Sequence, residues 1–221
     1  MDSRTQRYFD HHAARFDSIY HEGQPLQRAL NRTFRKAIYE RFAITFEQAE
    51  PLTGKTVLDI GCGSGRYAVE FARRGAARVV GVDYAPGMLS LAREYAAANG
   101  VAGRCEFIQG DFTTQMIDQR FDVVIAIGVF DYQDKPVEFM RKMAQHCRGR
   151  IVATFPGRSL IRMPLRKFRY WLANCPVLFY REQEVRDIGR NAGLRSVDIV
   201  PIQSSGSGFV LVGDVQAESS R

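Results

Sequence analysis

The stretch Val57-Leu58-Asp59-Ile60-Gly61-Cys62-Gly63-Ser64-Gly65 decides how this chain folds. Its first half is mostly apolar, which is typical of a buried strand, and its second half has glycine at every other position. Glycines at a strand end let the backbone turn sharply and let a ligand approach the main chain. Together with the helix expected over residues 65–74, the stretch predicts a ligand site at the carboxyl end of the first strand. The alternative is a turn that opens the helix and binds nothing.

Short apolar runs alternate with helical segments after this stretch, which predicts right-handed crossovers and a parallel sheet. The predicted strands cover residues 57–60, 78–82, 105–108, 121–127, 151–155, 194–202 and 209–212. The predicted helices cover residues 65–74, 86–99, 134–146 and 182–192. A tight turn at 204–208 joins antiparallel neighbours. The expected fold class is therefore α/β, with a seven-stranded Rossmann-like sheet, mostly parallel, an antiparallel last strand and helices on both faces.

The residues before Pro51 have helical spacing, because apolar side chains recur every three or four positions. The first set is Phe9, Ala13, Phe16 and Tyr20, and the second is Leu26, Leu30, Phe34, Ile38 and Phe42. Two short amphipathic helices are not stable alone, so residues 1–50 are expected to pack on the domain that follows, residues 51–215. Residues 216–221 are expected to form a flexible tail.

Composition excludes several classes of protein. With 45% apolar and 25% charged residues, the chain is neither disordered nor fibrous. A net charge of +7 is compatible with an anionic ligand or a membrane surface but too small to establish nucleic-acid binding. Four scattered cysteines without a Cys-x-x-Cys pair predict neither a metal site nor disulfides. The first residues lack the apolar core of a signal peptide, and no apolar run could span a bilayer, so a cytoplasmic protein is expected.

Asp83 ends the second predicted strand, 22 positions after Gly61. A carboxylate there can accept both hydroxyls of a ribose. Alternatively, it only caps the helix that begins near Pro86. The turn reads Gly-x-Gly-x-Gly, with Arg66 where a dinucleotide site would have a third small residue, which favours a mononucleoside ligand over a dinucleotide.

Four segments in order, residues 56–65, 79–88, 109–112 and 121–132, resemble the motifs of class I S-adenosylmethionine-dependent methyltransferases. The resemblance covers about residues 55–215 and implies S-adenosylmethionine as cofactor. It implies that Asp59 and the glycine turn hold the methionine part and that Asp83 holds the ribose. It also implies an adenine site beside Tyr84, Met88, Asp111 and Phe112, and a sulfonium site beside Ile127 and Gly128. The N-terminal segment would be a lid carrying Arg15 and Tyr20, for which ordinary helix packing is the alternative. The implied cofactor-binding residues of the turn are Asp59, Gly61, Cys62, Gly63 and Gly65.

The segment Ile127-Gly128-Val129-Phe130-Asp131-Tyr132 stands where this family faces the methyl acceptor. It has neither the Pro-Pro-aromatic motif of amino-group DNA methyltransferases nor the Pro-Cys of the cytosine-C5 class, so base methylation is disfavoured. Asp131 and Tyr132 are candidates to orient or deprotonate an acceptor hydroxyl, although Asp131 could instead only start the following helix. His11 suits a base role, with a surface position beside His12 as the alternative.

A basic amphipathic insert is expected at residues 157–180. Its cations are Arg158, Arg162, Arg166, Lys167 and Arg169, and Ile161, Leu165, Phe168 and Leu172 form an apolar stripe. Residues 158–172 are therefore predicted to contact a membrane surface or a lipophilic substrate. The alternative is a solvated face over a packed helix.

The expected function is methylation of a small, apolar or anionic acceptor, most simply on oxygen. The layout is loosely similar to the magnesium-protoporphyrin and ubiquinone-pathway O-methyltransferases, and the aromatic Tyr8-Phe9 with the insert after Phe155-Pro156 resembles the former. An RNA methyltransferase and a non-catalytic S-adenosylmethionine-binding module are the alternatives. Nucleic acid is not an expected partner, and no motif specifies an oligomeric state.

Overall fold

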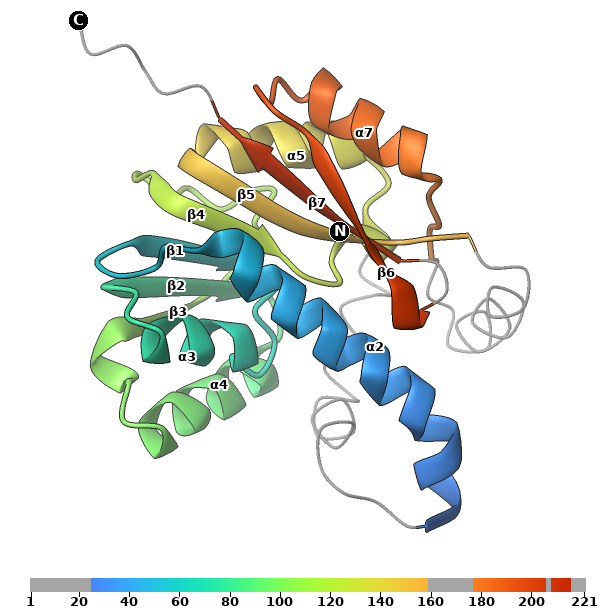
Figure 1. Ribbon diagram of the computed structural model, residues 1–221. Helices are drawn as coiled ribbons and strands as arrows, with labels where there is room; N and C mark the ends of the chain where they lie inside the picture. Colours follow the sequence, from blue (N-terminus) through green and yellow to red (C-terminus); the bar gives the residue numbers. More distant parts are fainter. Residues whose placement is uncertain (1–24, 159–176, 206–207, 216–221) are drawn as a thin grey trace, which may run out of the picture.

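The centre of the computed structural model, which describes residues 25–158, 177–205 and 208–215, is a seven-stranded sheet (Figure 1). The strand order is β3-β2-β1-β4-β5-β7-β6. The strands are β1 (Thr56–Ile60), β2 (Arg78–Asp83), β3 (Cys105–Gln109), β4 (Phe121–Ala126), β5 (Cys147–Pro156), β6 (Asp198–Ile202) and β7 (Gly208–Asp214). Strands β1 to β5 pair in parallel, whereas β7 runs antiparallel to both β5 and β6. The predicted seven strands and antiparallel last strand are confirmed.

Helices cover both faces of this sheet. The cluster of buried side chains on one face includes residues of α2 (Pro25–Ala49), α3 (Arg66–Arg73) and α4 (Pro86–Ala98). The cluster on the other face includes α5 (Pro136–Gln145) and α7 (Glu182–Asn191). Short 3-10 turns complete the fold: η2 (Ala102–Arg104), η3 (Phe130–Tyr132) and η4 (Gln203–Ser205). In the part of the chain described, no helix combines the length and apolar character needed to cross a membrane.

Helix α2 begins away from the sheet and runs in towards β1 (Figure 1). Its last turns are part of the core, because Phe46 is fully buried and packs on Phe71 with ring centroids 4.5 Å apart. Farther back, the Glu40 carboxylate accepts hydrogen bonds from the backbone N–H groups of Gln203 and Ser204, each at 2.8 Å. The helix is therefore fixed to the sheet at its end and to η4 at its middle.

The order of the strands positions the site. From β1 the chain builds outward to β2 and β3, and then returns to the other side of β1 to build β4 and β5. In parallel sheets the connections leave in opposite directions at such a reversal, which opens a crevice at the carboxyl ends of the two central strands. The ends of β1 and β4 are therefore where a ligand is expected.

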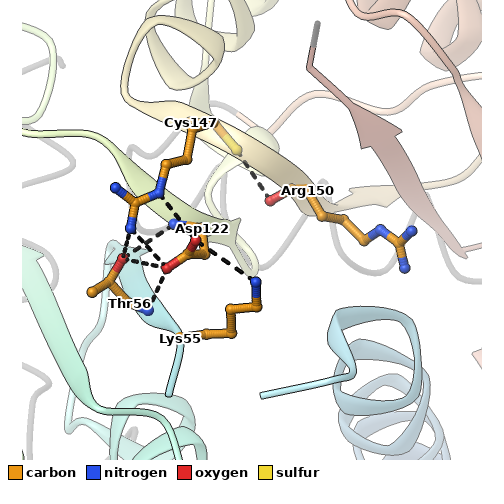
Figure 2. Close-up of polar contacts among 6 residues, drawn as sticks. Lys55, Thr56, Asp122, Cys147 and Arg150 are labelled. Carbon is orange, nitrogen blue, oxygen red and sulfur yellow. Dashed lines mark hydrogen bonds and ion pairs between the residues drawn. The ribbon is translucent and has the colours of Figure 1, made fainter. Parts of the chain in front are cut away.

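A polar cluster occupies the opposite edge, where β1 and β4 begin (Figure 2). The Asp122 carboxylate accepts hydrogen bonds from the Thr56 N–H at 2.8 Å and from both Nε and Nη2 of Arg148 at 3.0 Å. Lys55 lies 3.9 Å away. The Arg148 guanidinium is the main reason that the pKa of Asp122 lies well below its usual range, and the Thr56 hydrogen bonds add to the effect. This cluster ties the amino ends of two central strands together, far from the crevice.

Most strand boundaries lie within two residues of those predicted, but two strands begin four residues away from the expected start. Strand β5 begins at Cys147 instead of residue 151, because Cys147 pairs with Phe121 before an irregularity in the register, and the polar Arg148-Gly149-Arg150 concealed this start. Strand β6 begins at Asp198 instead of residue 194. There, the Leu194 N–H donates to the Gly189 carbonyl and so closes the end of α7.

Candidate cofactor and acceptor site

The three glycines of the turn after β1 all have positive φ, at +69°, +51° and +75° for Gly61, Gly63 and Gly65. A Cβ on Gly61 would lie 2.6 Å from the Val129 side chain, and one on Gly65 would lie 2.8 Å from the Ala92 Cβ. A Cβ on Gly63 would meet no atom of the described residues within 4 Å. The outer glycines are therefore needed for packing, whereas the middle one faces open space at the carboxyl end of β1.

The Asp83 carboxylate connects this turn to the chain after β2. Its Oδ2 accepts a hydrogen bond from the Gly63 N–H and its Oδ1 accepts one from the Ala85 N–H, both at 2.9 Å. The Gly110 N–H, after β3, donates to the Asp83 carbonyl at 2.9 Å. Helix α4 itself receives no side-chain cap, because the Asp83 bond goes to the amide of Ala85, the residue before the helix. Asp83 thus brings together the ends of three strands, which is more than the helix cap considered from the sequence.

Asp59, the fourth residue of β1, is 2% exposed. Its carboxylate accepts a hydrogen bond from the Ala68 N–H in the first turn of α3, but its Oδ2 has no partner in the described part of the chain. Burial and the nearby Asp83 charge raise the pKa of Asp59 to about 7. A buried carboxylate oxygen without a partner is costly to keep, so it points to a ligand that supplies a donor.

These observations fit the cofactor that the resemblance implies. The open space at Gly63 allows close approach to the backbone, and Asp59 offers an acceptor for an ammonium group. The other implied residues lie along the same edge: Tyr84 is half-buried and Met88 is 6% exposed at the start of α4. Asp111 is half-buried, with its carboxylate bound to the Thr113 N–H at 2.9 Å.

Two of the implied residues also belong to the protein core. The Phe112 ring is buried against Phe139 with centroids 5.4 Å apart, so only its backbone is free to face a ligand. The Cys62 sulfur lies within 2.8 Å of the position a Gly81 Cβ would take, so this side chain fills the space beneath the turn. Burial raises the pKa of the Cys62 thiol well above its usual value.

The end of β4 forms the other wall of the crevice. Gly128 has φ +74°, and its N–H donates to the Thr154 hydroxyl of β5 at 2.8 Å, while Ile127 is half-buried beside it. Asp131 and Tyr132 are both half-buried in η3. Helix α5 begins only at Pro136, with Lys135 before it, so the alternative that Asp131 starts this helix is wrong.

Three residues near this wall were not identified from the sequence. The Tyr180 hydroxyl donates to the Phe130 carbonyl at 3.1 Å, and the Leu178 N–H donates to the Asp131 carbonyl at 2.8 Å, so the return of the chain after the insert supports η3. Arg41 of α2 has its Nη1 3.9 Å from the position a Gly128 Cβ would take. A cation on the apolar face of a predicted helix was the only available signal for Arg41.

His11, Arg15 and Tyr20 lie outside the described residues. The same is true of residues 159–172, which are all but the first residue of the segment 158–172 predicted to contact a membrane or a lipophilic substrate. Of that segment only Arg158 is described, and its guanidinium pairs with Glu184 at 3.0 Å. The residues that the structure does bring together are therefore the glycine turn, Asp59, Asp83 and the wall at Gly128–Tyr132.

Comparison with known proteins agrees with this geometry. Residues 57–149 match the sequence profile of the family described as methyltransferase domain. The mitochondrial ubiquinone biosynthesis O-methyltransferase of Schizosaccharomyces pombe is 32% identical over 119 residues, which cover 52% of this chain and 43% of that protein. The ribosomal protein L11 methyltransferase of Edwardsiella ictaluri is 45% identical over 76 residues, 34% of this chain and 25% of that protein.

Among solved structures, magnesium protoporphyrin IX methyltransferase from Synechocystis with bound S-adenosylhomocysteine is similar, with a TM-score of 0.74. It is 19% identical, and the match covers 96% of this chain and 98% of that one. At that identity the likeness shows a common fold. The matched regions of the two sequence relatives span less than half of those proteins. The family match over residues 57–149 includes the glycine turn and Asp83.

Proposed function

Since the chain carries a class I S-adenosylmethionine-dependent methyltransferase domain, we propose that it methylates a small molecule, on an oxygen atom. The observation that carries the proposal is the buried Asp59 oxygen without a partner, next to a glycine turn that is open at Gly63 and held by Asp83. Two relatives named ubiquinone biosynthesis O-methyltransferases support oxygen as the methylated atom.

S-adenosylmethionine, when bound, supplies an electrophilic methyl group. The protein's own contribution to such a displacement is mostly positioning. Asp59 and the turn would hold the amino-acid part, Asp83 the ribose, and Gly128 with Ile127 the end nearest the acceptor. Backbone N–H groups and small residues on both walls allow this contact without side-chain interference.

Asp131 and Tyr132 are the residues we propose for the acceptor. Both lie in η3, which the Tyr180 hydroxyl and the Leu178 N–H fix to the neighbouring chain. A carboxylate on a backbone held in this way can orient a hydroxyl and accept its proton as the oxygen attacks. His11 remains a second candidate for that base. The predicted membrane or lipophilic contact of residues 158–172 would act on the same acceptor.

The first test is cofactor binding. Asp83→Ala should weaken S-adenosylhomocysteine binding at least tenfold in calorimetry, because losing a desolvated carboxylate–hydroxyl pair costs about 1.5–3 kcal/mol. Asp198→Asn, on the exposed side of β6, is the matched control and should bind normally. Near-native affinity in a folded Asp83→Ala protein contradicts the assignment of the ribose site.

The second test is turnover. The protein is incubated with methyl-labelled S-adenosylmethionine and a panel of phenols, carboxylic acids and RNA, and transfer to a small phenol or acid is expected. Methyl transfer to RNA and to no small molecule, at a rate that falls as the salt concentration rises, contradicts a small-molecule acceptor. Binding without transfer to any member of a broad panel favours the non-catalytic module.

A further inference from the structure

Asp59 differs from the other carboxylates of the site in how little supports its charge. Asp83 accepts two backbone hydrogen bonds, whereas Asp59 accepts one, from Ala68, and its Oδ2 is buried without a partner. Taking a carboxylate out of water without hydrogen bonds strongly disfavours the ionised form. In the free protein the surroundings of Asp59 therefore favour the protonated carboxyl over the carboxylate.

The charged and titratable neighbours strengthen this preference. Across the sheet, Asp59 pairs with Gly81 of β2 and Ile125 of β4, neither of which carries a charge. No described ion pair involves Asp59. The groups that interact with it or its neighbours are Asp83 of β2, Cys62 of the turn, Cys105 of β3, Arg93 of α4 and Arg104 of η2.

Two of these groups are cations, and the described interactions join them to the thiols. Arg104 acts on Cys105, whereas Arg93 acts on Cys62, and the Arg93 Nη2 donates to the Phe107 carbonyl at 3.0 Å. The two thiols are neutral because burial raises the pKa of each. The nearby carboxylate of Asp83 thus dominates the field at Asp59, and it favours the protonated carboxyl.

We propose that cofactor binding releases a proton from Asp59: at neutral pH a share of the free protein carries this carboxyl protonated, and the carboxyl ionises when the ligand's ammonium group meets its buried oxygen. The O–H bond of the acid breaks, its electron pair stays on the oxygen, and the proton passes to the buffer. The resulting carboxylate pairs with the ammonium cation, which supplies the missing donor. The inference rests on the proposed function, because it takes the amino-acid part of the cofactor as the ligand.

The size of the effect follows from linkage. A group with a pKa of about 7 is half protonated at pH 7, so binding should release about half a proton there. If the bound carboxylate stays ionised, affinity should be about tenfold weaker at pH 6 than at pH 8, because the free acid must first lose its proton. Without the coupling, affinity is nearly constant over this range.

The test is calorimetry of S-adenosylhomocysteine binding to the whole chain at pH 7 in phosphate and in Tris, whose ionisation enthalpies differ widely. The difference in observed enthalpy gives the number of protons released. 5′-Methylthioadenosine keeps the base and sugar but lacks the ammonium group, so it should bind without proton release. Release of the same proton by both ligands overturns the proposal, because the ammonium is then not the cause.

Asp59→Asn keeps an oxygen for the Ala68 N–H but cannot ionise, so it should bind without proton release at any pH from 6 to 8. Asp198→Asn is the matched control and should release as much as the wild type. Binding of S-adenosylhomocysteine with equal enthalpy in both buffers overturns the proton coupling and leaves the proposed function intact. Failure of the wild type to bind S-adenosylhomocysteine overturns both. The comparison of the two ligands on the wild type decides the question even where Asp59→Asn does not fold.

Discussion

Replacing Gly65 and Gly63 by alanine, one at a time, should separate the packing role of the glycine turn from its ligand role. Both residues have positive φ, so each alanine has a backbone strain of about 1–2 kcal/mol. At Gly65 the new methyl group would also lie 2.8 Å from the Ala92 Cβ and 3.1 Å from its Cα. Backbone of α4 cannot move aside easily, so this overpacking adds about 1–3 kcal/mol.

The sum for Gly65→Ala is about 2–5 kcal/mol, against about 1–2 kcal/mol for Gly63→Ala, where a Cβ would have no neighbour within 4 Å in the described part of the chain. For a chain of this size each kcal/mol lowers Tm by about 2–4 °C. Gly65→Ala should therefore lower Tm by about 2–12 °C more than Gly63→Ala, which is the effect of the overpacking alone. Affinity should respond differently from Tm in the two variants. A methyl group on Gly63 enters the open space, so Gly63→Ala should weaken S-adenosylhomocysteine binding at least tenfold.

Thermal unfolding followed by circular dichroism gives the two Tm values, and calorimetry gives the two affinities. Equal losses of Tm in the two variants would refute the packing argument for Gly65. Unchanged affinity in Gly63→Ala would show that the open side of the turn does not face the ligand.

Two further predictions concern pH and stability. Asp122 has a depressed pKa, so its contribution is present above its ordinary value and is lost as pH falls. Asp122→Ala should cost about 1–3 kcal/mol in urea unfolding at pH 7 and only modestly less at pH 3, because the folded-state pKa lies lower still, whereas Lys55→Met, which removes only the 3.9 Å contact, should change stability little. Asp59 has a raised pKa, so the free protein loses stability as pH rises from about 4 to 7. Asp59→Asn should therefore be more stable than the wild type at pH 8 by at least about 1 kcal/mol, with a smaller difference at pH 5; a constant difference between the two pH values contradicts the buried ionisation.

The sequence was most informative where local chemistry and fold agree. Alternating strands and helices predict the parallel sheet because each crossover must return over the sheet in one sense. The glycine turn can be recognised in the sequence because a backbone with positive φ favours glycine over residues with a side chain. Asp83 is likewise visible from its spacing, since it ends the strand next to the turn. These signals are local, and they correspond to the part of the chain that matches the family profile.

Strand boundaries were less predictable, because pairing partners decide them. Cys147 belongs to β5 through its pairing with Phe121, although polar residues follow it. An acidic residue before a helical run often starts the helix, which made Asp131 a candidate for that position, but the helix begins at Pro136. In both cases the deciding contacts are made with residues distant in sequence.

Sequence alone determined the fold class, the glycine turn and the identity of the acids beside it, because spacing and residue type carry that information. Only the tertiary structure showed that the Gly63 side is open, that Asp83 joins three strand ends, and that one oxygen of Asp59 is buried without a donor. It also placed Arg41 and Tyr180 at the wall formed by β4 and η3. Burial, open space and unmet hydrogen bonds arise from packing between separate elements, and no single segment of the sequence encodes them.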